Sequence, residues 1–143
     1  MTCKIMVLSD SFHIRTEAIR YAMELAKRLD ASLALLLVLP FEYPEIAETE
    51  LEAVKELGFK AGGIIKKYVE RIENLGISVE PAVRIGDPHS ELVKFLAESD
   101  RFYSIIWGGE PDSVNDRYHW MSNLKDEVKC NILVPFMKKP VEA

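Results

Sequence analysis

The sequence is poor in the residues that most often build metal centres and disulfide scaffolds. It has two cysteines and three histidines in 143 residues, with no short paired spacing of the zinc-binding kind. Two cysteines are too few for the disulfide framework of a small secreted domain. The formal net charge is −5, whereas a protein that binds a nucleic-acid backbone needs a clustered basic surface. We therefore expect neither a metal site nor a nucleic-acid partner.

Long hydrophobic runs are also missing. The longest, Leu33 to Pro40, has about the length of a strand and is too short to span a bilayer. Met1 is followed directly by a strand pattern instead of the charged and apolar regions of a signal peptide. These features predict a soluble, cytoplasmic protein without a membrane partner.

Apolar residues are nevertheless plentiful, at 48% of the chain, which is enough for one domain with a core of its own. Short apolar segments alternate with segments that repeat apolar residues at helical spacing. Strands are expected over residues 4–8, 33–39, 77–85, 103–107 and 131–136. Helices are expected over residues 16–29, 49–74 and 122–128, with another that begins at residue 88. The domain would span residues 1–137, followed by a polar tail at 138–143.

Strands that alternate with helices predict a parallel sheet with right-handed crossovers. The first, second and fourth strands are apolar throughout, as in strands covered on both faces. Pro81 cannot donate to a strand ladder, so the third strand belongs at an edge. A doubly wound, Rossmann-like α/β fold with strand order 3-2-1-4-5 satisfies both conditions. Its switch point lies between strands 1 and 4, so a ligand is expected near Asp10, Val38 and Gly108.

Local signals predict where the helices begin and where one is interrupted. Thr16 is expected to cap the first helix, and Asp87 to cap the third, with Pro88 at its first position. The glycines between Gly58 and Gly63 predict a bend or break in the second helix, because each costs about 1 kcal/mol relative to alanine.

Four segments, in this order and spacing, resemble the universal stress protein family. They are Ile5-Met-Val-Leu-Ser-Asp-Ser-Phe12, Gly86-Asp-Pro-His-Ser-Glu-Leu-Val93, Ser104-Ile-Ile-Trp-Gly108 and Cys130-Asn-Ile-Leu-Val134. The resemblance covers nearly the whole domain. It implies a UspA-like stress-response protein with an adenine nucleotide alpha hydrolase-like fold, and a homodimer paired through the last strand. The apolar strip Ile132, Leu133 and Val134 on that edge strand would form the dimer interface.

Nucleotide-binding members of that family carry Gly-x-x-Gly, then about nine residues, then Gly-Ser or Gly-Thr, which offer N–H groups and a hydroxyl to phosphates. Here Gly108-Gly109 matches the first position, but Pro111-Asp112 stands where the second glycine is expected. Proline has no N–H to offer, and aspartate repels anionic oxygens. Met121 replaces the glycine before Ser122. The sequence therefore predicts a degenerate ATP-binding motif.

Two hypotheses about function stay open. In the first, the chain is a regulatory or interaction module with no cofactor and an unidentified protein partner. The aromatic run from Arg117 to Trp120, including Tyr118, then folds over the end of the sheet. In the second, an altered loop binds ATP or AMP. The residues nominated for that site are Asp10, Val38, Gly108, Gly109 and Ser122. Asp10 could equally cap N–H groups of its own loop, and Val38 could be ordinary core.

Catalysis is not expected, because no nucleophile, base and orienting residue stand at a recognisable spacing. A phosphoacceptor receiver domain has a similar alternation of strands and helices. Its chemistry requires an acidic cluster after strand 1, an aspartate after the middle strand and a lysine after the last. Asp10 alone follows strand 1 here, and Pro135-Phe136 stands in place of the lysine.

Overall fold

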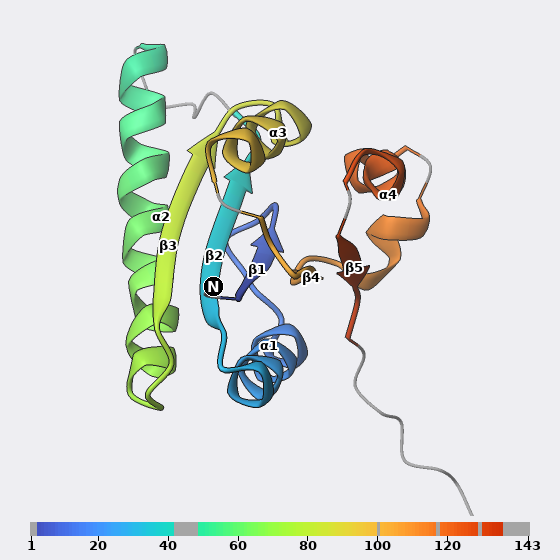
Figure 1. Ribbon diagram of the computed structural model, residues 1–143. Helices are drawn as coiled ribbons and strands as arrows, with labels where there is room; N and C mark the ends of the chain where they lie inside the picture. Colours follow the sequence, from blue (N-terminus) through green and yellow to red (C-terminus); the bar gives the residue numbers. More distant parts are fainter. Residues whose placement is uncertain (1–2, 42–48, 100, 117, 129, 136–143) are drawn as a thin grey trace, which may run out of the picture.

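The computed structural model describes residues 3–41, 49–99, 101–116, 118–128 and 130–135 (Figure 1). The expected polar tail at 138–143 lies outside the described residues. The strands are β1 (Lys4–Ser9), β2 (Ser32–Leu39), β3 (Val79–Ile85), β4 (Ser104–Trp107) and β5 (Asn131–Leu133). The helices are α1 (Thr16–Leu29), α2 (Glu50–Glu73), α3 (Pro88–Glu98) and α4 (Leu124–Glu127), with 3₁₀ turns η1 (Pro111–Asn115) and η2 (Trp120–Asn123).

The five strands form one parallel sheet in the order β3-β2-β1-β4-β5, which confirms the predicted topology. β1 is central, and its Met6 lies between Ala34 of β2 and Ile105 of β4. β3, which contains Pro81, is an edge strand as expected. β5 is the opposite edge and ends at Leu133, so it is shorter than the sequence indicated.

The sheet is covered on both faces, which explains why its inner strands are apolar without interruption. On one face, odd-numbered residues of β1 and β2 pack against α1 and α2. On the other, even-numbered residues pack against α3, η2 and α4. Fully buried side chains from the second face include Met6, Leu36, Trp107 and Met121. Among the described residues, no helix is both long and apolar enough to cross a membrane.

Asp87 caps α3 as predicted, whereas Thr16 does not cap α1. The Asp87 carboxylate accepts hydrogen bonds from the Ser90 amide at 3.0 Å and the Ser90 hydroxyl at 2.8 Å. The bond from the Ser90 hydroxyl is the largest of the causes that lower the pKa of Asp87. Thr16 is instead the first residue of α1, and Arg15 stands at the cap with its side chain turned to the carbonyls of Trp107 and Pro135.

The predicted break in α2 is wrong, because the helix runs without interruption from Glu50 to Glu73. Gly58, Gly62 and Gly63 all lie inside it. The helix is anchored along its length by four buried residues, Ala53, Ala61, Ile65 and Ile72. Tertiary packing of an apolar face contributes more to helix stability than residue propensity does, so it overrides the cost of the glycines.

Candidate functional site

The switch point lies where the chain leaves β1 and β4 toward opposite faces of the sheet. After β1 it enters α1 on one face, and after β4 it runs through η1 and η2 to the other. The Gly108 amide donates to the carbonyl of Leu8 at 2.7 Å, so the two strand ends are held side by side. Ligands of doubly wound proteins bind in the crevice between such diverging segments.

The two glycines at this point make room for side chains of the protein itself. A Cβ on Gly108 would stand 2.8 Å from Cγ2 of Ile14, and a Cβ on Gly109 would stand 2.4 Å from the ring of Trp107. Among the described glycines, Gly76 and Gly86 have a positive φ, whereas Gly108 and Gly109 do not. Close packing therefore accounts for the double glycine without a phosphate.

Asp10, at the end of β1, is bound by residues more than a hundred positions away. Its Oδ2 accepts a hydrogen bond from Nε1 of Trp120 at 3.0 Å and lies 2.8 Å from Nε2 of His119. Nδ1 of His119 accepts the amide N–H of Met121 at 3.0 Å, which leaves the proton of a neutral imidazole on Nε2. His119 therefore donates to Asp10, and both ring nitrogens are engaged.

Three aromatic side chains, Trp107, His119 and Trp120, form an aromatic cap over this end of the sheet. Trp107 meets His119 and Trp120 edge to face, with ring centroids 5.9 Å apart in each pair. His119 and Trp120 are 5.7 Å apart. The two edge-to-face pairs of Trp107 have the separation and orientation that are favourable for aromatic rings. Trp120 thus folds back over the sheet as expected, whereas Tyr118 is 82% exposed and does not.

Asp10 does not cap its own loop, which was one of the two interpretations offered for it. Ser9 takes that role. Its Oγ accepts the amide N–H of Ser11 at 3.3 Å and donates to the carbonyl of His13 at 2.8 Å. The Asp10 carboxylate is therefore left for the aromatic cap.

Arg15 was not nominated by the sequence, yet its side chain ties the strand ends together. The guanidinium donates to the carbonyl of Trp107 at 2.9 Å, to that of Pro135 at 2.7 Å, and to that of Gly109. Burial is the largest cause of the lowered pKa of Arg15, because it removes water from the charged group. The planar fork of arginine suits contacts with several acceptors. No local pattern marks this residue, because its partners lie 92 to 120 positions away.

The remaining nominated residues lie in two environments. Val38 is fully buried, in the same core cluster as Met121, which is also fully buried. Ser122 lies in η2, where its hydroxyl donates to the carbonyl of His119 at 2.9 Å. The structure therefore brings Asp10, Gly108 and Gly109 to one edge together with the aromatic cap. It places Val38 beneath the surface of that edge.

His89, at the start of α3, contacts Glu127 of α4 through Nε2 and Oε2. This contact joins the two helices on the face of the sheet that α3, η2 and α4 cover. Across the described part of the chain, no three histidine, cysteine, aspartate or glutamate side chains gather in a way that could hold a metal ion. Cys3 and Cys130 are both free thiols, and burial raises the pKa of Cys130.

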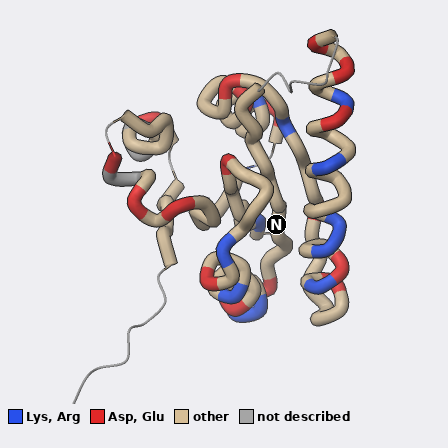
Figure 2. The backbone as a smooth tube through the Cα atoms, turned by 180° about the vertical axis from the view of Figure 1, so that it is seen from behind, with Lys and Arg blue, Asp and Glu red and all other residues tan. Residues whose placement is uncertain are grey.

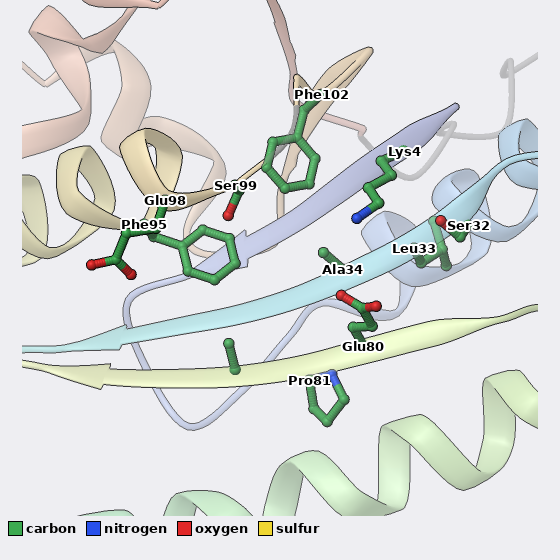
Figure 3. A pocket seen from close by; sticks show the side chains of 11 residues that line it. Lys4, Ser32, Leu33, Ala34, Glu80, Pro81, Phe95, Glu98, Ser99 and Phe102 are labelled. Atoms are coloured by element: carbon green, nitrogen blue, oxygen red, sulfur yellow. The ribbon is translucent and has the colours of Figure 1, made fainter. Parts of the chain in front are cut away.

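A pocket of about 270 Å³ lies at the other end of the sheet (Figure 3). Its floor is Ala34 of β2, and its walls include Phe95 and Phe102, whose rings stack with centroids 6.2 Å apart. Figure 3 shows Lys4 and Glu80 extending from strands on either side of Ala34. Because these residues lie near the amino ends of their strands, the pocket is separate from the switch point.

The sequence profile described as the Universal stress protein family matches residues 1–101. The chain belongs to the universal stress protein family. The match includes β1 through α3, and it ends before β4 and the aromatic cap. The residues on which the predicted departure from the nucleotide-binding motif rests, Pro111, Asp112 and Met121, follow the matched segment. No curated protein matches the chain significantly.

Several solved structures share this fold, and each matches nearly the whole length of this universal stress protein. The hypothetical protein MJ0577 is 21% identical with a TM-score of 0.71, and the match covers 97% of this chain and 99% of that one. UspA from Lactobacillus plantarum is 17% identical, with a TM-score of 0.66 and coverage of 94% and 97%. A family protein from Arabidopsis thaliana with AMP bound is 13% identical, with a TM-score of 0.60 and coverage of 93% and 90%.

Proposed function

We propose that this universal stress protein is a regulatory or interaction module that does not bind ATP in the usual way. The observation that carries the proposal is the pairing of Asp10 with His119 and Trp120 at the switch point. A ligand at this edge would have to displace the indole and imidazole donors from the carboxylate. It would also have to replace the aromatic contacts of Trp107 with its own.

The chemistry of the loop also disfavours a phosphate group. Pro111 offers no N–H donor, and Asp112 adds negative charge close to the double glycine. Arg15 reaches this edge, but its guanidinium already serves three backbone carbonyls. A phosphate would compete with those carbonyls for the same N–H groups, so binding it would loosen the strand ends.

The module is non-catalytic in this proposal. Asp10, His119 and Ser122 are the residue types of a hydrolase catalytic triad, but their contacts differ from those of a triad. A catalytic serine donates its hydroxyl to a histidine nitrogen that can accept the proton. Here Nε2 of His119 faces Asp10, and Nδ1 is occupied by the amide N–H of Met121. The Ser122 hydroxyl donates to the His119 carbonyl instead. The imidazole therefore has no nitrogen left to serve as base for that hydroxyl.

Adenine-nucleotide binding is the second candidate function. Universal stress protein structures of similar fold are described in complex with cAMP, AMP and dAMP. Binding by this chain would require Trp120 to move away from Asp10, which would then face the ligand together with Gly108 and Gly109. Mass spectrometry of the small molecules that copurify with the protein distinguishes the two candidates. We expect no nucleotide near stoichiometric amount, and ATP or AMP at one equivalent would overturn the first proposal.

The chain is proposed to form a homodimer through the free edge of β5. Ile132, Leu133 and Val134 are all partly exposed, and an unpaired strand edge favours pairing with another chain. Light scattering at micromolar concentration should give twice the chain mass of 16.3 kDa. Ile132→Asp should shift this mass toward that of the monomer, because it places a charge in the interface. Asn131→Asp, at an exposed position of the same strand, is the control, and a monomeric wild type would refute the dimer.

A further inference from the structure

The pocket at the amino end of the sheet has a lining of its own, separate from the switch point. It lies between the amino ends of β1, β2 and β3 and the end of α3 (Figure 3). Its volume is about 270 Å³. Sites for drug-sized ligands occupy roughly 300–1,000 Å³, so this pocket suits a smaller molecule, of about the size of an amino acid.

The space exists because two positions on one face of the sheet carry alanine. Ala34 of β2 pairs in register with Glu80 of β3, and Leu36 pairs with Ala82 farther along the same strands. Ala34 and Ala82 contribute only methyl groups to this face, whereas Leu36 is a large side chain that is fully buried in its core cluster. The sheet and α3 are therefore closely packed around Leu36 and leave a cavity over Ala34.

One wall of the pocket is aromatic. The rings of Phe95 and Phe102 stack with an angle of 22° between their planes. Phe102 is buried, and Phe95 is half-buried. The guanidinium of Arg84 lies over the ring of Phe95, 5.4 Å from its centroid, and holds that side chain from another direction. The wall therefore offers a firm apolar surface to the hydrocarbon part of a ligand.

Side chains of opposite charge stand on either side of the floor, with Glu80 on β3 and Lys4 on β1. Across the described residues, Glu98 pairs with Arg84 at 3.8 Å, whereas Glu80 forms no ion pair. An ammonium group has three N–H donors, so Lys4 can bind a carboxylate in addition to the contact that it already makes. The last turn of α3 has no basic residue, and the negative end of its helix dipole favours a ligand cation.

We propose that this pocket binds a free α-amino acid with a short apolar side chain. The ammonium group of the ligand pairs with Glu80, its carboxylate pairs with Lys4, and its side chain packs against Phe95 and Phe102. A purely cationic ligand would be repelled by Lys4 and a purely anionic one by Glu80, so a zwitterion is the ligand that both charges favour. The site gives a regulatory module a small-molecule signal that does not depend on a nucleotide at the switch point.

Titration of the ¹⁵N-labelled full chain with L-leucine and, separately, with L-valine tests the site by ¹H–¹⁵N NMR. We expect saturable shifts of the Ala34, Ala82 and Ser99 amide signals at millimolar ligand, while those of Gly108 and Gly109 stay in place. If neither amino acid shifts the pocket signals, the proposal is wrong, and the switch-point signals in the same spectra keep this result separate from the question of nucleotide binding.

Two analogues of leucine each lack one charged group. 3-Methylbutylamine has no carboxylate, and 4-methylpentanoate has no ammonium group. Each should bind about tenfold more weakly than leucine or worse, because a hydrogen bond to a charged group contributes roughly 1.5–3 kcal/mol. Equal affinity for leucine and either analogue would overturn the zwitterion as the ligand.

Variants separate the pocket from a loss of folding. Glu80→Gln removes a charge at an exposed position, so it should weaken leucine binding about tenfold while leaving the circular dichroism spectrum unchanged. Glu70→Gln is the matched control, at an exposed glutamate of α2 outside the pocket, and should retain the affinity. α2 carries charged residues toward both of its ends, so the loss of one of them is a mild change (Figure 2).

Ala82→Leu tests the cavity itself. The larger side chain should fill the space and abolish the shifts of the Ala34 and Ser99 signals, with the rest of the spectrum still that of a folded protein. Unchanged leucine affinity in Glu80→Gln or in Ala82→Leu would overturn the proposal.

Discussion

Replacing Arg15 with alanine is expected to lower the free energy of unfolding by about 3 kcal/mol. Hydrogen bonds from a charged donor contribute roughly 1.5–3 kcal/mol each, and bonds that share one donor are not additive. The substitution leaves the carbonyls of Trp107, Gly109 and Pro135 without the guanidinium that now serves them. It also removes the side chain that links the end of β4 to Pro135 after β5. Urea unfolding monitored by circular dichroism measures the effect.

Two further variants serve as controls for Arg15→Ala. Arg15→Lys keeps the charge and loses the planar fork, so it should recover only part of the lost stability. Arg20→Ala removes an exposed arginine from the same helix and should change the free energy of unfolding by less than about 0.5 kcal/mol. If Arg15→Ala is as mild as Arg20→Ala, the guanidinium does not hold the strand ends together.

Met121→Ala is expected to cost about 3 kcal/mol of unfolding free energy, within the usual range of roughly 2–5 kcal/mol for a buried methionine. The side chain is fully buried, and it packs in the cluster that contains Trp107 and Val38. Met121, which stands where the family resemblance implies a glycine, is therefore part of the core of this chain. Thermal and urea unfolding measure the loss.

Met121→Leu is the matched control for this substitution. It nearly conserves volume, so its cost should stay below about 1.5 kcal/mol. A mild effect of Met121→Ala, equal to that of the leucine variant, would mean that the loop packs loosely. The aromatic cap would then be easier to displace than its contacts indicate.

The fold could be predicted because its signals are local and repeated. Continuous apolar strands such as residues 33–39 indicated burial on both faces, and Pro81 indicated an edge. Together they gave the strand order that the structure shows. Asp87 with Pro88 is a short motif, so the start of α3 was also predicted correctly. The break in α2 was predicted wrongly, because glycine propensity was weighed without the tertiary contacts that anchor the helix.

The position of the candidate site could be predicted from the sequence, but the contacts between its residues could not. Topology placed Asp10 and Gly108 at the switch point. The pairing of Asp10 with His119 joins residues 109 positions apart, and Arg15 reaches Pro135 across 120 positions. No spacing rule connects residues so distant. The aromatic run was expected over the sheet, but only the structure shows that Trp120 turns inward and Tyr118 outward.

The closed state of the switch point is tested most directly through the indole N–H of Trp120. This proton is bonded to Asp10, and its signal in a ¹H–¹⁵N NMR spectrum reports any change in that bond. The protein is titrated with Mg-ATP and, separately, with AMP to millimolar concentration. We expect the Trp120 indole signal, and that of Trp107, to stay in place throughout both titrations. A saturable shift of the Trp120 signal with either nucleotide would contradict a switch point closed by the protein's own residues.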